Sequence, residues 1–168
     1  WSAAGFGPNE FFFSYGYFFG DSGPSEVIGV DGNDFSIFDD GDNIWDAEPT
    51  IALGPIDGAP HLVVDGMGID DELALFRITD GSLIGTFDIG GENGLSQVAV
   101  DPQGRIYVGS GGGMRVFVKD GNSLEEVANV PVDSTRFAIR DVGPTSKQIF
   151  IVGYRDPLVL SRFELQFE

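Results

Sequence analysis

The chain has 168 residues, of which 42% are hydrophobic and 12% aromatic, so it can bury the core of one domain and falls outside the disordered class. Acidic residues outnumber basic ones 27 to 9, and the net charge of −18 excludes nucleic acid and anionic lipid as partners while favouring cations or basic partners. No apolar run approaches the roughly 20 residues of a membrane helix, so membrane insertion is not expected. The absence of Cys excludes disulfides and thiolate chemistry.

The charge is unevenly distributed along the chain. Residues 1–76 hold 15 acidic residues and no Lys or Arg (−15), whereas residues 77–168 hold 12 acidic and 9 basic residues (−3). An Asp-rich, Lys-poor composition suits a salty or calcium-containing exterior, and simple solubility explains it equally well. We expect an extracellular or periplasmic location. The chain opens on Trp1 rather than Met, as expected of a processed form or a piece of a longer protein.

Asp-Gly pairs recur with a spacing of 40 residues, at Asp40-Gly41, Asp80-Gly81 and Asp120-Gly121. Each pair follows a run of apolar and β-branched residues, and Asp-Gly supplies the positive φ that a tight hairpin turn requires. The spacing therefore predicts a repeated unit of four short strands. We expect the three pairs to occupy equivalent turns between the third and fourth strands of their units.

In chain order, the predicted strands fall into four units. The first unit has strands at residues 11–19, 26–30, 35–38 and near 43–45, and the second at 50–53, 61–64, 72–78 and 82–89. The third has strands at 95–100, 105–110, 114–119 and 124–130, and the fourth at 136–140, 148–152 and 158–166. Four-stranded units of this size are typical of β-propeller blades. The predicted fold is an all-β propeller of about four four-stranded blades in a single domain, residues 1–168, either a complete small propeller or a fragment of a larger one.

The blades span approximately residues 10–48, 49–91, 92–132 and 133–168, and the last one lacks a fourth strand. Propellers commonly close when one terminus completes the blade that the other began. Residues 1–9 would then complete the last blade, with Trp1 to Phe6 hydrogen-bonded alongside residues 158–166. The alternative is that another segment or another chain covers that strand edge.

Two segments resemble known propeller repeats. GLSQVAVDPQGRIYVGSGGGMRVFV is similar to NHL-type and SMP-30-type repeats, in which a strand, an Asp-Pro-x-Gly turn and an Ile-Tyr-Val strand recur. LALFRITDGSLIGTFDIG resembles the outer half of a quinoprotein-type repeat, with Thr86 in place of the usual Trp. The resemblance covers about residues 72–120 and implies a fold. It implies no single function, because these families include lactonases, quinone-dependent dehydrogenases and pure binding modules.

The densest group of carboxylates is a candidate cation site. It consists of Asp39, Asp40, Asp42, Asp46 and Glu48. Calcium takes 6–8 oxygen ligands, so Ca²⁺ is the one cofactor that the sequence suggests. The pattern departs from an EF-hand loop and falls one residue out of register with the Asp-box of sialidase propellers, so a solvated turn is the alternative. A weaker cluster of the same kind consists of Asp65, Asp70, Asp71 and Glu72.

Other residues that often carry chemistry favour structural roles. His61 is the only histidine, so a His-rich metal site is excluded and any Ser-His-Asp arrangement would need this residue. We expect instead one hydrogen bond at a strand end. Gln97, Arg136 and Arg140 lie on first strands, where structural hydrogen bonding is expected. The aromatic run at residues 11–19 predicts either a buried strand or an exposed strip for carbohydrate or a partner.

The sequence offers no convincing acid–base pair, nucleophile or His-based metal site. We therefore expect a non-enzymatic binding or assembly module in an extracellular or cell-surface structure. Its expected partners are other protein chains or a carbohydrate, with self-assembly among the options. The alternative is a calcium-dependent propeller enzyme of the lactonase or hydrolase type.

Overall fold

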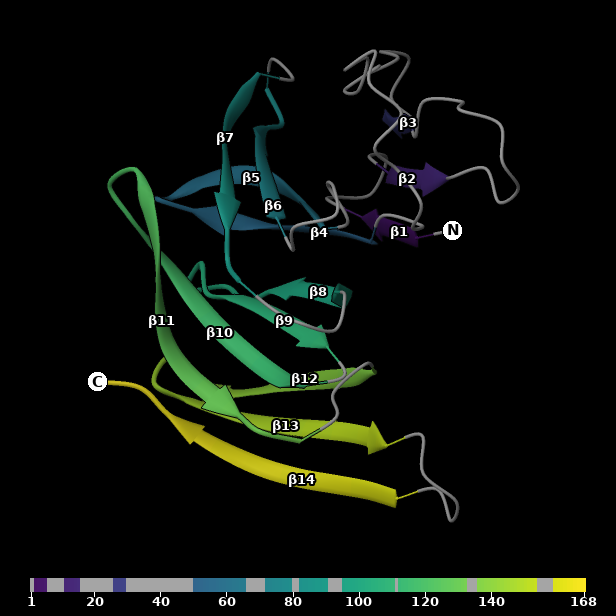
Figure 1. Cartoon of the computed structure of the whole chain (residues 1–168). Coiled ribbons are helices and arrows are strands. Elements are labelled where there is room, and N and C mark those ends of the chain that lie inside the picture. The colour runs from purple at the N-terminus through teal and green to yellow at the C-terminus, as the bar shows by residue number, and fades with distance from the viewer. Residues whose placement is uncertain are drawn as a thin grey trace.

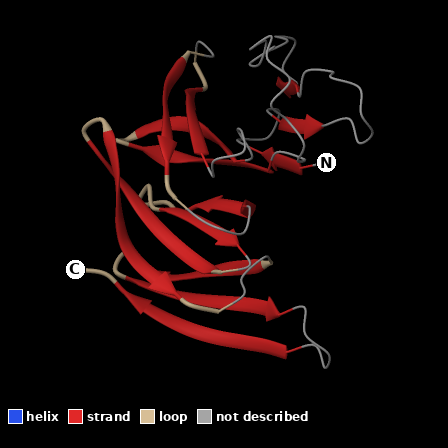
Figure 2. Cartoon of the chain, viewed as in Figure 1, coloured by secondary structure: helices blue, strands red, loops and turns tan. Residues whose placement is uncertain are grey.

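In a computed structural model of the protein, the described residues are 2–5, 11–15, 26–29, 50–65, 72–79, 82–90, 95–110, 112–132, 136–153 and 159–168. These residues form strands and turns, and none of them lies in a helix (Figure 2). The predicted all-β class is therefore confirmed. No helix in this part of the chain has the length and apolar character needed to cross a membrane.

The strands form four antiparallel sheets, each built from strands that follow one another in the sequence (Figure 1). The first sheet contains β1 (Ser2–Gly5), β2 (Phe11–Tyr15) and β3 (Glu26–Gly29). The second contains β4 (Thr50–Ile56), β5 (Ala59–Asp65), β6 (Glu72–Arg77) and β7 (Leu83–Asp88). The third contains β8 (Leu95–Val100), β9 (Ile106–Ser110), β10 (Gly113–Asp120) and β11 (Ser123–Val130). The fourth contains β12 (Phe137–Gly143), β13 (Ser146–Gly153) and β14 (Val159–Gln166).

The strands predicted from residue 50 onward are present, with ends shifted by a few residues. Alternating and continuous apolar runs bounded by turn sequences such as Asp120-Gly121 and Asp101-Pro102-Gln103-Gly104 suffice to locate them. The turn at Asp120-Gly121 lies where predicted, because Asp120 pairs with Ser123 across the β10–β11 hairpin and Gly121 has a φ of 56°. The other two pairs of the 40-residue spacing, Asp40-Gly41 and Asp80-Gly81, lie outside the described residues.

The prediction for the first sheet is wrong in two respects. Residues 11–19 were expected to open this unit, but β1 precedes β2 and pairs with it from Ser2 to Gly5, which places β2 between β1 and β3. The same pairing contradicts the expectation that Trp1 to Phe6 runs alongside residues 158–166. A partner only a few residues away closes a short loop at a much smaller entropy cost than a partner more than 150 residues away. The strands expected at residues 35–38 and 43–45 lie outside the described part.

The third sheet is covered on both faces. Ile106 and Val108 of β9 pack in a core shared with the second sheet, together with Leu73 and Leu75 of β6. Tyr107, which points to the opposite face, packs with Ile149 and Ile151 of the fourth sheet. Because successive side chains of a strand point to opposite faces, a strand covered on both sides is buried at consecutive positions, as β9 is from Ile106 to Gly109.

The second and third sheets approach each other closely at two glycines. A Cβ atom on Gly54 of β4 would lie 2.3 Å from Cγ1 of Val100 in β8. A Cβ atom on Gly104, whose φ is 82°, would lie 2.6 Å from the carbonyl oxygen of Pro55. The short distance between these two sheets therefore depends on the absence of side chains at both positions.

Candidate functional site

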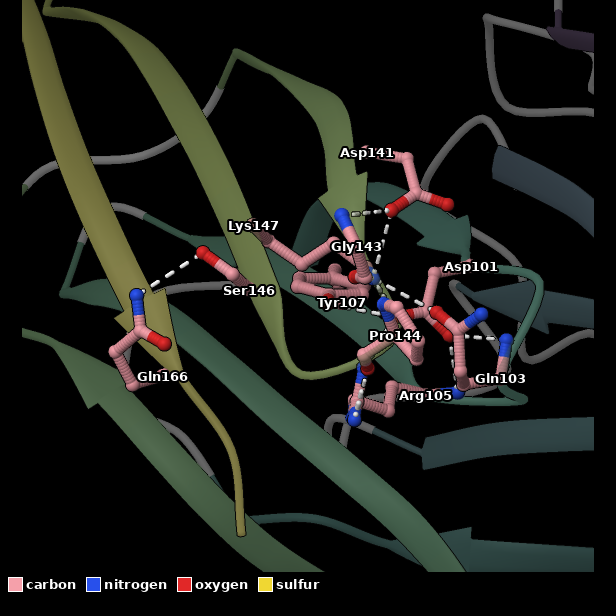
Figure 3. Close-up of polar contacts among 10 residues, drawn as sticks. All are labelled: Asp101, Gln103, Arg105, Tyr107, Asp141, Gly143, Pro144, Ser146, Lys147 and Gln166. Atoms are coloured by element: carbon pink, nitrogen blue, oxygen red, sulfur yellow. Dashed lines mark hydrogen bonds and ion pairs between the residues drawn. The ribbon is translucent and has the colours of Figure 1, made fainter.

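A cluster of charged side chains is buried where the third and fourth sheets meet, and it begins at the turn between β8 and β9 (Figure 3). The N–H of Gly104 donates to the carbonyl of Asp101 at 3.0 Å, which closes the turn. The N–H of Gln103 donates to Oδ1 of Asp101 at 2.9 Å, the local bond that favours Asp at the start of a turn. The Asp-Pro-Gln-Gly sequence thus fixes the position of the Asp101 carboxylate.

Asp101 is 3% exposed and accepts four hydrogen bonds. Its Oδ1 accepts a second bond from the backbone N–H of Arg105 at 3.0 Å. Its Oδ2 accepts from Nη1 of Arg105 at 3.1 Å and from the hydroxyl of Tyr107 at 2.9 Å. A carboxylate offers about four acceptor positions, so the bonds within the chain satisfy Asp101 completely.

Lys147, on β13, is fully buried beside this carboxylate. Its Nζ donates to Oε1 of Gln103 at 2.7 Å, to Oδ1 of Asp141 at 3.0 Å and to the carbonyl of Gly143. It also lies 3.8 Å from Oδ2 of Asp101. An ammonium carries three donors, and all three have acceptors here, which is the condition under which a buried charge is tolerated.

Arg105 connects the same turn to the fourth sheet. Its Nη2 donates to the carbonyl of Pro144, in the turn between β12 and β13, at 2.8 Å. Its guanidinium group lies 3.9 Å from the centre of the Phe167 ring, just beyond β14. Cations stack favourably on aromatic faces, so Arg105 contacts two segments at the same end of the fourth sheet, the β12–β13 turn and the residue after β14.

Two titratable groups of the cluster are held in one protonation state. Burial raises the pKa of the Tyr107 phenol above its ordinary value of 10.0, and the charge and hydrogen bond of Asp101 raise it further. The hydrogen bond from Lys147 lowers the pKa of the Asp141 carboxyl, and the bond from the Gly143 N–H lowers it further. Tyr107 is therefore a permanent donor and Asp141 a permanent acceptor near neutral pH. The cluster is chemically suited to hold two sheets together.

The two polar residues expected to have structural roles make hydrogen bonds within the chain, although His61 lies inside β5 rather than at a strand end. His61 is buried, and its Nδ1 donates to the carbonyl of Ala59 at 2.8 Å. The side-chain amide of Gln97 in β8 donates to the carbonyl of Phe137 at 2.9 Å and accepts from its N–H at 2.8 Å. Gln97 thereby joins β8 to β12 as a neighbouring strand would. Arg140 is exposed and donates to Oε1 of Gln148 at 3.4 Å.

The predicted cation site cannot be placed in this geometry. Its members Asp39, Asp40, Asp42, Asp46 and Glu48 lie outside the described residues. Asp70 and Asp71 of the weaker cluster also lie outside them, as do the side chains of Asp65 and Glu72. Among the residues that the structure describes, no three His, Cys, Asp or Glu side chains are grouped to hold a metal ion. The calcium site therefore stays a prediction.

The sequence contained an unused indication of the buried cluster. Lys147 alternates with Ile149 and Ile151, and the period of two places all three on the buried face of β13. The other lysine, Lys119, also lies at a boundary between sheets, where its Nζ is 2.7 Å from Oδ2 of Asp57. Both lysines of this acidic chain therefore connect adjacent sheets.

Comparison with protein-family models, with curated proteins and with solved structures finds no match. The similarity of the Asp101–Gly104 turn to propeller repeats therefore stays at the level of a motif. Any functional interpretation depends on the arrangement of the described residues. That arrangement consists of stacked sheets, an internally satisfied polar cluster and, at the end of the stack, a strand with no described strand on its outer side.

Proposed function

We propose that the chain is a non-enzymatic binding or assembly module in an extracellular or cell-surface structure, built as a β-propeller of about four blades. Four meandering sheets in sequence order support this architecture, as do the contacts of β4 with β1 and with β8. β1, β4 and β8 are the first strands of their sheets, and the hydrogen bonds of Gln97 connect β8 to β12, the first strand of the fourth sheet. First strands that adjoin one another are what a propeller requires around its axis.

The observation that carries the binding role is the open edge of β14. This strand pairs with β13 on one side, and no described strand lies on the other. The N–H of Phe167 donates to the carbonyl of Thr145, so odd-numbered residues direct their backbone groups toward β13. The N–H and C=O groups of Leu160, Arg162, Glu164 and Gln166 consequently point away from the sheet. They are available to a further strand.

The polar cluster holds this edge in place, and its own polar groups are already paired within the chain. Every donor of Lys147 and every acceptor position of Asp101 is occupied by a group of the chain itself. The contact of Arg105 with Phe167 and the bond from Gln166 to Ser146 at 3.0 Å fix the C-terminal part of β14. A rigid, open edge is the requirement for binding by strand addition, in which main-chain hydrogen bonds supply affinity.

The proposed partner is therefore a protein segment in an extended conformation. Carbohydrate binding would depend on the aromatic run at residues 11–19, whose side chains lie outside the described part. The lactonase or hydrolase alternative requires carboxylate oxygens from several sheets to converge on one ion. No observation on the described residues favours that alternative.

A peptide that copies β11, residues 123–130, tests the proposal, since β11 is the fourth strand of the neighbouring sheet. We expect saturable binding to the wild-type chain and loss of binding in Glu164→Pro, because proline removes an N–H that points outward. A peptide of the same composition in scrambled order is the control for nonspecific attraction. Absence of binding, or equal binding to Glu164→Pro, would contradict strand addition at β14.

A further inference from the structure

β14, the outermost strand of the fourth sheet, carries opposite charges on either side of its midpoint (Figure 1). Phe163 lies midway between Val159, where the strand begins, and Phe167, whose N–H still donates on the β13 side. Arg162 and Glu164 flank Phe163, and their side chains are 61% and 55% exposed at a separation of 3.6 Å. Exposed pairs of this kind contribute little stability, so both charges remain available to a partner.

The backbone of β14 restricts how a further antiparallel strand can pair with it. The outward N–H and C=O groups belong to the even-numbered residues from Leu160 to Gln166, as the pairing of β14 with β13 requires. In an antiparallel ladder, a residue whose backbone groups point toward the other strand lies opposite a residue that does the same. If the further strand is another β14, even-numbered residues therefore pair with even-numbered residues. The possible registers then differ by steps of two residues.

One of these registers brings opposite charges together. When Phe163 lies opposite Phe163 of a second copy, Arg162 of each copy lies opposite Glu164 of the other. The same register pairs the strand along its full length, because Val159 then lies opposite Phe167. The two neighbouring registers place Arg162 opposite Arg162, or Glu164 opposite Glu164. Opposite charges across a strand pair are stabilising and like charges are destabilising, so charge and strand length select the same register.

The apolar residues of β14 favour this register as well. Phe163 and Leu165 pack against the core between the third and fourth sheets and are only partly buried. In the selected register, the two Phe163 rings meet as a non-hydrogen-bonded pair, in which opposite side chains lie closest, and Leu165 lies opposite Ser161. Aromatic pairs across neighbouring strands stabilise a sheet. The contact therefore extends the apolar core of each copy across the shared edge.

We propose that a second copy of this chain occupies the β14 edge, with the two β14 strands antiparallel about a two-fold axis at Phe163. The pairing joins two three-stranded sheets into one sheet of six strands. The contact is isologous, so it closes at two chains. Each copy has a net charge of −18, but at about 0.15 M salt charges more than about 8 Å apart are largely screened. This inference rests on the proposed function of β14 as a binding edge, and it names the partner.

Charge reversal at the two residues that flank Phe163 tests the proposal. Light scattering of the wild-type chain should show a mass that rises with concentration from 18.0 kDa to twice that value and no further. Arg162→Glu alone and Glu164→Arg alone should each raise the dissociation constant of the dimer about tenfold or more, because each places like charges opposite one another. An equimolar mixture of the two variants should associate again, because every cross-strand pair then joins an acidic to a basic residue. Association of the mixture also shows that both variants are folded.

Three results would overturn the proposal. They are a wild-type chain that stays at 18.0 kDa at every concentration, growth beyond two chains, and a mixture of the two variants that associates no better than either variant alone. The β11 peptide separates this inference from the proposed function, because the peptide competes for the same edge and should dissociate the dimer. If the peptide binds and the wild-type chain stays monomeric, only the second-copy inference fails; if neither association occurs, strand addition at β14 fails as well.

Discussion

Lys147 is fully buried in a chain with three times as many acidic as basic residues, and each of its three donors has an oxygen partner. Such a group stabilises the folded state only while its partners stay in place. The cluster could not be predicted in full from the sequence, because Lys147 meets Gln103 and Arg105 meets Pro144 across about 40 intervening residues. The period of two does predict that Lys147 shares a face with Ile149.

Replacing Lys147 by Met should lower the free energy of unfolding by about 3–5 kcal/mol, because Gln103, Asp141 and Gly143 lose their common donor. Lys119→Met is the control, since Lys119 donates to the carbonyl of Gly121 and to Asp57, whose side chain is 58% exposed. Loss of that pair should cost about 1 kcal/mol or less. Urea denaturation measures both values, and equal losses would contradict the structural role assigned to Lys147.

Asp141 makes the contribution of the cluster to stability depend on pH. The bond from Lys147 lowers the pKa of this carboxyl from its ordinary 3.8, so its folded pKa lies below its unfolded pKa. The stabilisation is therefore complete above about pH 3.8 and is lost as the pH falls through the lower, folded value. As the pH falls below 4, the melting temperature should decline less steeply in Asp141→Asn than in the wild type. Parallel curves for the two proteins would show that the ion pair contributes nothing.

At the scale of the element, the direction of each N–H along β14 determines what a proline does there. Ser161 pairs with Ile151 and directs its N–H toward β13, whereas Glu164 directs its N–H outward. Ser161→Pro should cost about 3 kcal/mol or more, and Glu164→Pro much less, because only the former loses a ladder hydrogen bond. Urea denaturation of the two variants compares them. A larger loss in Glu164→Pro would mean that its N–H already has a partner.

Strands in the second, third and fourth sheets could be predicted because turn residues bound each apolar run. The β4–β5 turn was not singled out, although Asp57 and Gly58 have φ values of 53° and 73°, as an Asp-Gly hairpin turn requires. In the first sheet, SAAG of β1 lacks the β-branched and aromatic residues that indicate a strand, whereas the aromatic run that begins at Phe11 indicates one strongly. The prediction therefore assigned the first position in this sheet to the wrong strand.

At the scale of the molecule, the stack depends on how closely the second and third sheets approach. Gly54→Ala should cost about 1–3 kcal/mol, because the new methyl group would occupy the position of the Val100 side chain. Val100→Ala in the same chain should recover part of that loss, because the two sites are in contact. Gly143→Ala is the control, since a Cβ atom there meets no atom within 4 Å. Equal unfolding free energies for Gly54→Ala and Gly143→Ala would contradict the close packing.

The arrangement of the whole molecule is compatible with the partner site proposed at the end of the stack. The third sheet has neighbours on both sides, whereas no described element lies on one face and one edge of the fourth. The cluster around Lys147 joins these two sheets, so a partner bound to the fourth sheet is held against the rest of the molecule.

Residue-resolved amide exchange along β14 tests most directly the proposal that this strand is an open edge that binds a further strand. In dilute protein, the amides of Leu160, Arg162, Glu164 and Gln166 should exchange fast, and those of Ser161, Phe163 and Leu165 should exchange slowly. Saturation with the β11 peptide should slow the first group and leave the second unchanged. Slow exchange of the first group without any partner, or fast exchange that the peptide does not alter, would contradict the account of β14 as an open, binding edge.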